Sequence, residues 1–275
     1  MSDLVTAPEL ADLLSHDEVV VLDAQFALMG PSSNELYAAG HVPGAPHLPL
    51  EPALAGPAGP GGRHPLPDPD VLQDHLRRCG VHDGSAVVVY DQASSLSAAR
   101  AWWILRWAGL TDVRVLDGGL AAWRSAGLEV ATDAVEPEPG TITVRPGSVP
   151  VVTVDRVPEG ARDGILLDVR APERFRGEVE PIDPVAGHIP GAVNLPMSAL
   201  QNADGTFRSP DQIRALAAAS GADGSVPVTT SCGSGVTAAQ MSLALAEAGI
   251  ESTPFIGSWS EWITDPARPV ATGAD

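Results

Sequence analysis

The chain has 275 residues and a formal net charge of −19, and all 16 of its Lys and Arg side chains are arginine. Hydrophobic residues make up 44% and charged residues 19%, a profile typical of a packed globular protein that excludes a disordered one. The acidic balance disfavours a general nucleic-acid-binding protein, because a phosphate backbone would be repelled. The absence of lysine excludes a lysine Schiff base.

Taken in chain order, short β-branched runs alternate with helical patterns. The runs that predict buried parallel strands are Val19–Leu22, Ala86–Tyr90, Val113–Leu116, Ile165–Leu167 and Val226–Thr230. The helical patterns cover Ser97–Ala108, Asp211–Ala219 and Thr237–Ala248. Residues 51–70 are rich in proline and glycine, which predicts a surface loop in the first half of the chain. The alternation predicts an α/β fold with a mainly parallel sheet flanked by helices in each half.

The two cysteines, Cys79 and Cys232, are too few for a disulfide framework. The N-terminus shows no basic stretch followed by an apolar run, so we expect no signal peptide. The longest apolar stretch, residues 98–110, is interrupted by Arg100 and Arg106 and is too short to cross a bilayer. The histidines are scattered without metal-ligand spacing. We therefore expect a cytoplasmic protein that binds no membrane, no nucleic acid, no metal and no cofactor.

The sequence contains an internal repeat. The string His-Val-Pro-Gly-Ala at residues 41–45 returns as His-Ile-Pro-Gly-Ala at residues 188–192. Each copy also has a Leu-Asp pair that ends an apolar run, a second apolar run, and a Gly-x-x-x-x-Trp element near its end. The pattern indicates a tandem duplication of one domain, with copies at residues 1–128 and 151–275. Residues 129–150, rich in Pro, Glu and Gly, predict the linker between them.

In the second copy a predicted strand ends at Cys232, and a loop with two glycines leads from there into a helix. Glycine lets the backbone curl, so that successive N–H groups can point inward as an anion-binding nest. The start of the helix adds the positive end of its dipole. These features are expected to stabilise the Cys232 sulfur as a thiolate. Cys79 stands near a helix end without this pattern, so we expect a structural role for it.

Several kinds of chemistry use a reactive cysteine. A phosphatase loop places an arginine six positions after the cysteine, but that position here is Ala238. A cysteine protease needs a histidine base. His41 and His188 both lie in the repeated turns, which indicates an architectural role for each. The chemistry that is left is a thiolate that attacks soft sulfur and holds it as a persulfide.

Over nearly the whole chain these motifs resemble the rhodanese superfamily. The loop that begins at Cys232 is similar to that of the two-domain 3-mercaptopyruvate sulfurtransferases. Thiosulfate-using rhodaneses typically carry Arg and Lys directly after the cysteine, where this sequence has Gly233 and Ser234. The resemblance implies transfer of sulfane sulfur from 3-mercaptopyruvate to a thiophilic acceptor. Thiosulfate as the donor, and a non-enzymatic persulfide carrier, stay open as alternatives.

The resemblance also implies which residues bind the donor. Arg174 matches the substrate arginine of the family. The other expected binding residues form the loop after the cysteine: Gly233, Ser234, Gly235, Val236 and Thr237. Mercaptopyruvate enzymes usually carry a second arginine, which is absent from residues 178–183, and Arg176 could compensate for it. Arg170 is expected to form a structural ion pair.

In the first copy, Asp91 stands where the second copy has Cys232, and a carboxylate cannot accept sulfur as a persulfide. Residues 92–95 contain no glycine, so we expect no nest there and a catalytically silent domain. The resemblance implies that this domain forms one wall of the site. It could bring His41 toward the donor, although a structural turn is the favoured role for this histidine.

The expected mechanism is a two-step, ping-pong transfer. Arg174 and the loop amides orient a small anionic sulfur donor, and the Cys232 thiolate takes its sulfur. Ser234 could hydrogen-bond the donor or assist proton movement, or be only a small loop residue. If the donor is 3-mercaptopyruvate, pyruvate leaves. Cyanide, a small thiol or a protein dithiol then removes the sulfur from Cys232.

Overall fold

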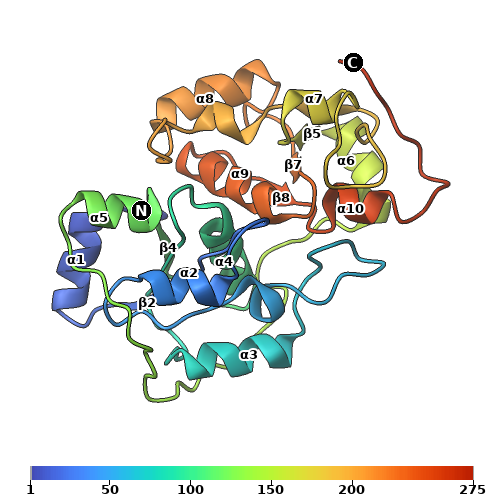
Figure 1. The fold of residues 1–275 in the computed structure, drawn as a ribbon. Coiled ribbons are helices and arrows are strands. Elements are labelled where there is room, and N and C mark those ends of the chain that lie inside the picture. Colours follow the sequence, from blue (N-terminus) through green and yellow to red (C-terminus); the bar gives the residue numbers. More distant parts are fainter. Residues whose placement is uncertain (1, 275) are drawn as a thin grey trace. The chain divides into compact units, whose positions relative to one another are not determined.

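The computed structural model describes residues 2–274, which form two compact units (Figure 1). The first unit comprises the chain up to Gly56 together with Leu66–Val149 and Ala203–Thr206. The second unit comprises Pro57–Pro65, Pro150–Asn202 and the chain from Phe207 onward. Each half of the sequence thus contributes one short segment to the unit that the other half mainly builds.

The first unit is built on a four-stranded sheet. In chain order its elements are β1 (Leu4–Val5), α1 (Ala7–Ser15), β2 (Val20–Asp23), α2 (Ser33–Ala39), η1 (Leu50–Leu54), α3 (Pro69–Arg78), β3 (Val87–Tyr90), α4 (Leu96–Trp107), β4 (Val113–Leu116) and α5 (Gly119–Ser125). The strands pair in parallel in the order β1-β4-β3-β2. All four residues of β3 are buried, as expected for a parallel strand covered on both faces.

The second unit repeats this design. Its elements are η2 (Val154–Arg156), α6 (Val157–Asp163), β5 (Ile165–Asp168), α7 (Pro172–Phe175), β6 (Ala192–Asn194), η3 (Met197–Leu200), α8 (Pro210–Ala219), β7 (Val228–Ser231), α9 (Val236–Glu247), β8 (Thr253–Pro254) and α10 (Ser258–Trp262). The sheet order is β6-β5-β7-β8, again all parallel. The predicted α/β fold with a parallel sheet in each copy is therefore confirmed.

Helices α4 and α9 begin differently from the other long helices. Helix α8 has a complete capping box, in which Ser209 and Gln212 satisfy each other's backbone N–H groups. Helices α4 and α9 have no side-chain cap and follow a residue with left-handed backbone, Ser95 at φ 59° and Gly235 at φ 82°. Their first N–H groups are therefore available to a ligand or side chain at the carboxyl end of the preceding strand.

The histidines of the two repeated turns have the same surroundings. The His41 ring stacks on Tyr37 at 4.0 Å, and the His188 ring stacks on Phe175 at 3.7 Å. Each histidine directs Nδ1 at the carbonyl oxygen of its stacking partner, at 3.0 Å and 2.7 Å respectively. Both side chains are fully buried. These contacts give both histidines the architectural role that their repeated turns predict.

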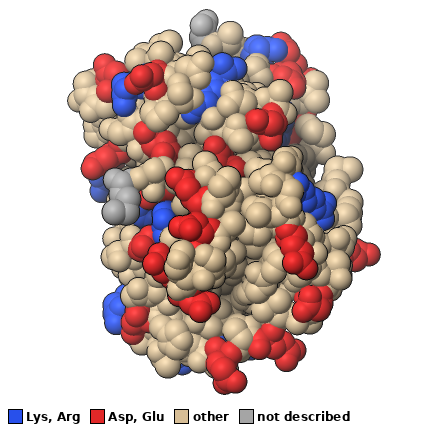
Figure 2. All heavy atoms as spheres, turned by 90° about the vertical axis from the view of Figure 1, so that its left-hand side faces the viewer, with Lys and Arg blue, Asp and Glu red and all other residues tan. Residues whose placement is uncertain are grey.

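The face drawn in Figure 2 shows how the net charge is distributed. Acidic side chains are scattered across this face together with isolated arginines, and neither sign gathers in one large patch. Within residues 2–274 no helix is both long and apolar enough to span a membrane. In the same part of the chain no group of three or more His, Cys, Asp or Glu side chains is arranged to hold a metal ion.

Candidate active site

Cys232 follows β7 directly and is 2% exposed. The Gly235 N–H donates a hydrogen bond to the Cys232 Sγ at 3.1 Å, and the Ser258 hydroxyl lies 3.8 Å from the same sulfur. The Cys232 N–H donates to the Ser258 oxygen at 3.1 Å, which fixes the two residues against each other. The sulfur thus lies at the carboxyl end of a parallel strand, where such sheets bind ligands.

Gly235 aims its N–H at the sulfur because its backbone is left-handed, with φ at 82°. A Cβ at this position would lie 2.8 Å from the carbonyl carbon of Ile256, closer than real Cβ atoms come. Both the φ value and this close approach require glycine. The predicted nest at the start of α9 therefore depends on Gly235 more than on Gly233.

Replacement of Gly235 with alanine tests this dependence. We expect a loss of about 1–3 kcal/mol of stability from strain and overlap, and at least a tenfold fall in turnover as the N–H moves off the sulfur. Gly249→Ala is the matched control, because Gly249 also has positive φ (74°) but nothing lies within 4 Å of its Cβ position. Equal activities of the two variants at the same temperature would contradict the assignment.

Arg174 is held by carboxylates of the loop at residues 178–183. Its Nε donates to both Glu180 oxygens at 3.1 Å, and its Nη2 donates to Glu180 at 2.6 Å and to Asp183 at 3.3 Å. Burial alone would raise the pKa of Glu180, but the Arg174 guanidinium and the N–H groups of Asp183 and Ile182 hold it below its ordinary value. The Arg174 side chain is 16% exposed, so its guanidinium is oriented before any donor binds.

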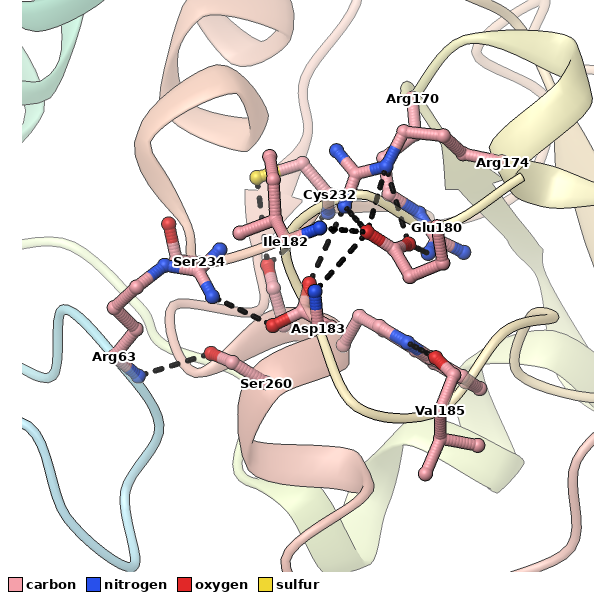
Figure 3. Close-up of polar contacts among 12 residues, drawn as sticks. Arg63, Arg170, Arg174, Glu180, Ile182, Asp183, Val185, Cys232, Ser234 and Ser260 are labelled. Carbon is pink, nitrogen blue, oxygen red and sulfur yellow. Dashed lines mark hydrogen bonds and ion pairs between the residues drawn. The ribbon is translucent and has the colours of Figure 1, made fainter. Parts of the chain in front are cut away.

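A second arginine reaches this loop from the segment Pro57–Pro65. The Arg63 Nη1 donates to Asp183 Oδ1 at 2.5 Å, while Arg174 bonds the other oxygen of the same carboxylate. The Arg63 N–H donates to the Ser260 hydroxyl at 3.0 Å, which ties the segment to α10. Figure 3 shows Asp183 between the two guanidinium groups, with Cys232 beside them.

The same segment brings a histidine to the cysteine loop. The His64 Nδ1 lies 2.8 Å from the Ser234 Oγ, and both side chains are buried. The sequence suggests that Ser234, two residues after Cys232, binds the donor or assists proton movement. The structure adds the His64 imidazole in hydrogen-bond contact with this serine. A buried Ser–His pair of this kind can pass a proton between a bound donor and the ring.

Arg170 forms the structural ion pair that the sequence predicts. Its guanidinium bonds Asp168 at 2.6 Å and the Gly187 carbonyl oxygen at 2.8 Å, and it lies over the Trp259 ring. Burial would lower the pKa of Arg170, but Asp168 and Glu180 raise it above its ordinary value. This arginine is 4% exposed, and its guanidinium links the carboxylates of Asp168 and Glu180.

Of the other residues that the sequence suggests, three lie at the cysteine loop and one lies away from it. Val236 is buried and Thr237 half-buried at the start of α9, directly after the loop. Gly233 lies next to the arginines, because a Cβ there would be 3.2 Å from the Arg63 Nη2. Arg176 is engaged elsewhere, in a 2.8 Å ion pair with Glu178 on a more exposed part of the loop.

Sequence reasoning missed Arg63, His64, Asp183 and Ser258. The stretch 51–70 was expected to be a surface loop of the first copy, and this was wrong for its central part, because Pro57–Pro65 belongs to the second unit. No local pattern marks such a contact, since its partners lie more than a hundred residues along the chain. Ser258 carried one signal, its place in the repeated Gly-x-x-x-x-Trp element.

The first copy retains an anion-binding nest, which corrects the expectation that residues 92–95 would form none. The Asp91 carboxylate accepts N–H groups from Ala93, Ser95, Ser97 and Ala98 at 3.0–3.3 Å. Ser95 supplies the left-handed residue that Gly235 supplies in the second copy. Burial raises the pKa of Asp91, and the four N–H groups partly oppose that shift. The nest thus holds a side-chain carboxylate of its own.

Known proteins with similar sequences belong to the family that the motifs suggest. The family model of the rhodanese-like domain matches residues 6–126 and 153–265. SseB of Mycobacterium tuberculosis, provisionally named a thiosulfate sulfurtransferase, is 46% identical over 98% of this chain and 97% of its own. A Pseudomonas aeruginosa protein, provisionally named a 3-mercaptopyruvate sulfurtransferase, is 45% identical over 99% of each chain.

Among solved structures, SseA from Escherichia coli superposes with a TM-score of 0.85 at 33% identity, over 95% of this chain and 100% of its own. That structure is described as showing the rhodanese fold of 3-mercaptopyruvate sulfotransferases. The resemblance drawn from the motifs is therefore confirmed over both copies. The chain belongs to the rhodanese family, as a tandem pair of rhodanese-like domains.

Proposed function

We propose that this chain is a sulfurtransferase that moves sulfane sulfur from 3-mercaptopyruvate to a thiophilic acceptor through a persulfide on Cys232. The observation that carries the proposal is the hydrogen bond from the Gly235 N–H to the Cys232 Sγ, with Arg63 and Arg174 converging beside Gly233. Backbone N–H groups at a helix start stabilise the anionic sulfur before and after it accepts a second sulfur. The neighbouring guanidinium groups suit an anionic donor.

The charge of the site favours a monoanionic donor. Three guanidinium groups and three carboxylates form one connected cluster, which we call the arginine–carboxylate cluster: Arg63, Arg170, Arg174, Asp168, Glu180 and Asp183. Its formal charges balance, so the cluster offers a doubly charged thiosulfate no excess of positive charge. A single carboxylate such as that of 3-mercaptopyruvate needs less compensation.

The first half-reaction needs one proton transfer. The Cys232 thiolate attacks the donor sulfur, the carbon–sulfur bond breaks, and its electron pair goes to the donor carbon as an enolate. The proton of the donor thiol goes to that carbon, so that pyruvate leaves and Cys232 carries a persulfide anion. We infer that the Ser234–His64 pair carries this proton, because Ser234 belongs to the loop after Cys232 and its Oγ lies 2.8 Å from the His64 Nδ1.

The second half-reaction returns the enzyme to its thiolate. A nucleophile such as cyanide attacks the outer sulfur, the sulfur–sulfur bond breaks, and the electron pair returns to Cys232. A small thiol or a protein dithiol can act in the same way, and we propose these as acceptors. We also propose that the protein acts in the cytoplasm, because the mechanism needs a free thiol and both Cys79 and Cys232 are free.

Thiosulfate is the second candidate donor, supported by the provisional name of the Mycobacterium tuberculosis relative. Steady-state kinetics of the wild type with each donor and cyanide separates the two. We expect kcat/KM for 3-mercaptopyruvate to exceed that for thiosulfate by about tenfold or more, from the charge difference of one unit near the cluster. An equal or higher kcat/KM for thiosulfate would overturn the choice of donor. Persulfide formation without turnover on any small acceptor would favour a carrier.

A further inference from the structure

We propose that Arg63 is a donor-binding residue that decides specificity: with Arg174 it clamps the carboxylate of the donor beside Cys232. This inference rests on the proposed function and adds to it a residue from the first half of the chain. Arg63 is not part of the cysteine loop or of the loop at residues 178–183, and it reaches the site through the segment Pro57–Pro65.

The backbone of this segment is fixed, so the Arg63 side chain is directed at the site rather than left to solvent. The Arg63 N–H donates to the Ser260 hydroxyl, and Gly62 packs so closely that a Cβ there would lie 2.8 Å from the Gly257 carbonyl oxygen. Gly62 also has positive φ, at 96°. Glycine before Arg63 is thus required to bring this arginine against α10.

The two guanidinium groups converge on one point. A Cβ built on Gly233 would lie 3.2 Å from the Arg63 Nη2 and 3.7 Å from the Arg174 Nη2. Gly233 directly follows Cys232, so a donor carboxylate at this point would hold its sulfur-bearing carbon near the Cys232 Sγ. The Asp183 Oδ2 lies 3.7 Å from the same position, so a donor carboxylate would share the two guanidinium groups with Asp183.

Asp183 shows that the pair can hold a carboxylate. This side chain is 2% exposed, and it offers one oxygen to Arg63 and the other to Arg174. In this arrangement it neutralises and orients the guanidinium groups while one face of Arg63 stays available. The Arg63 side chain is 25% exposed, and its buried Nε has no hydrogen-bond partner among the described residues. An unpaired buried donor beside the nucleophile indicates a ligand that accepts hydrogen bonds.

The arrangement also explains how the site binds a carboxylate without a cation directly after Cys232 or a second arginine in residues 178–183. Arg63 supplies that positive charge from another segment, on the opposite side of Asp183 from Arg174. In a cluster whose formal charges balance, one added guanidinium contact compensates a singly charged carboxylate more fully than a doubly charged thiosulfate. Arg63 therefore contributes to the choice between donors as well as to affinity.

The test compares Arg63→Gln with Arg162→Gln, a matched loss of one arginine whose side chain is 69% exposed and pairs with its neighbour Asp163. We expect Arg63→Gln to raise KM for 3-mercaptopyruvate about 10- to 100-fold, the effect of one lost charge-assisted hydrogen-bonding pair, with kcat changed less than about threefold. KM for cyanide should stay at the wild-type value, because the persulfide is discharged after the carboxylate has left. Arg63→Lys should recover part of the affinity.

Each of the other possible results would contradict one part of the proposal. If Arg63→Gln and Arg162→Gln both kept the wild-type kcat and KM, the role of Arg63 would be overturned and the proposed function would stay intact. A lowered melting temperature with both substrates affected equally would make Arg63 a structural residue and overturn the inference. Absence of wild-type turnover would overturn the proposed function, and calorimetry with pyruvate would then decide about Arg63. Pyruvate carries the same carboxylate, so Arg63→Gln should weaken its binding at least tenfold, and equal binding would refute the clamp.

Discussion

Replacement of Cys232 with serine is expected to abolish sulfur transfer, with turnover falling by about a thousandfold or more. Loss of the nucleophile in a covalent mechanism costs at least this factor, because the remaining groups only bind and orient the donor. The serine oxygen fits the same place and can still accept the Gly235 N–H, so the fold should be unchanged. The rate is measured with 3-mercaptopyruvate and cyanide, and the mass of the protein is measured after exposure to donor alone.

The chain provides a matched control in Cys79. This cysteine is also buried, and burial raises the pKa of its thiol to about 12, so it stays protonated and unreactive near neutral pH. Cys79→Ser should therefore keep wild-type turnover and should gain the mass of one sulfur at Cys232. Retained turnover in Cys232→Ser, or a sulfur located on Cys79, would show that the persulfide mechanism is wrong.

The fold could be predicted where the sequence signal is local. Strands β2, β3, β4, β5 and β7 each overlap one of the expected apolar or β-branched runs, and helices α4 and α9 lie within one residue of the expected bounds. Strands β1, β6 and β8 could not be predicted, because two or three residues show no periodicity and pair only when a neighbouring strand is present. The division into copies at residues 1–128 and 151–275 stays a prediction.

The site was predictable only in the part that is contiguous in sequence. A strand, a cysteine and a Gly-x-Gly loop before a helix identify the nucleophile and its nest, because all of them lie between residues 228 and 247. The acidic residues at 178–183 were interpreted only as a departure from the family pattern, whereas Glu180 and Asp183 orient Arg174. Arg63 and His64 could not be assigned, since a contact with a distant segment leaves no trace in local composition.

The two copies place different side chains at the same position, between a strand and the helix that follows it. In both, a strand leads into a helix that has no side-chain cap, and a residue with left-handed backbone stands directly before that helix. The second copy places the Cys232 sulfur there and leaves it to react. The first copy places the Asp91 carboxylate there, where it accepts hydrogen bonds from three buried N–H groups and one part-buried N–H group. We therefore expect Asp91 to contribute to the stability of the fold, and Cys232 to sulfur transfer.

Asp91→Ala tests this division, and we expect it to lower the free energy of unfolding by about 3 kcal/mol or more. The change leaves the buried N–H groups of Ser95, Ser97 and Ala98, and the part-buried one of Ala93, without their acceptor. Each buried group costs roughly 1–3 kcal/mol before relaxation and entry of water. Urea denaturation at pH 7 measures the effect, with Asp12→Ala as the control.

Asp12 lies in the same unit, and its side chain is 78% exposed, so removal of its carboxylate should change stability by less than about 0.5 kcal/mol. At a temperature where Asp91→Ala is still folded, it should load one sulfur on Cys232 as the wild type does, because the four residues whose N–H groups bond the Asp91 carboxylate belong to the first unit. Equal denaturation midpoints for the two alanine variants would show that the four N–H groups find other partners, and that Asp91 is not what holds this nest together.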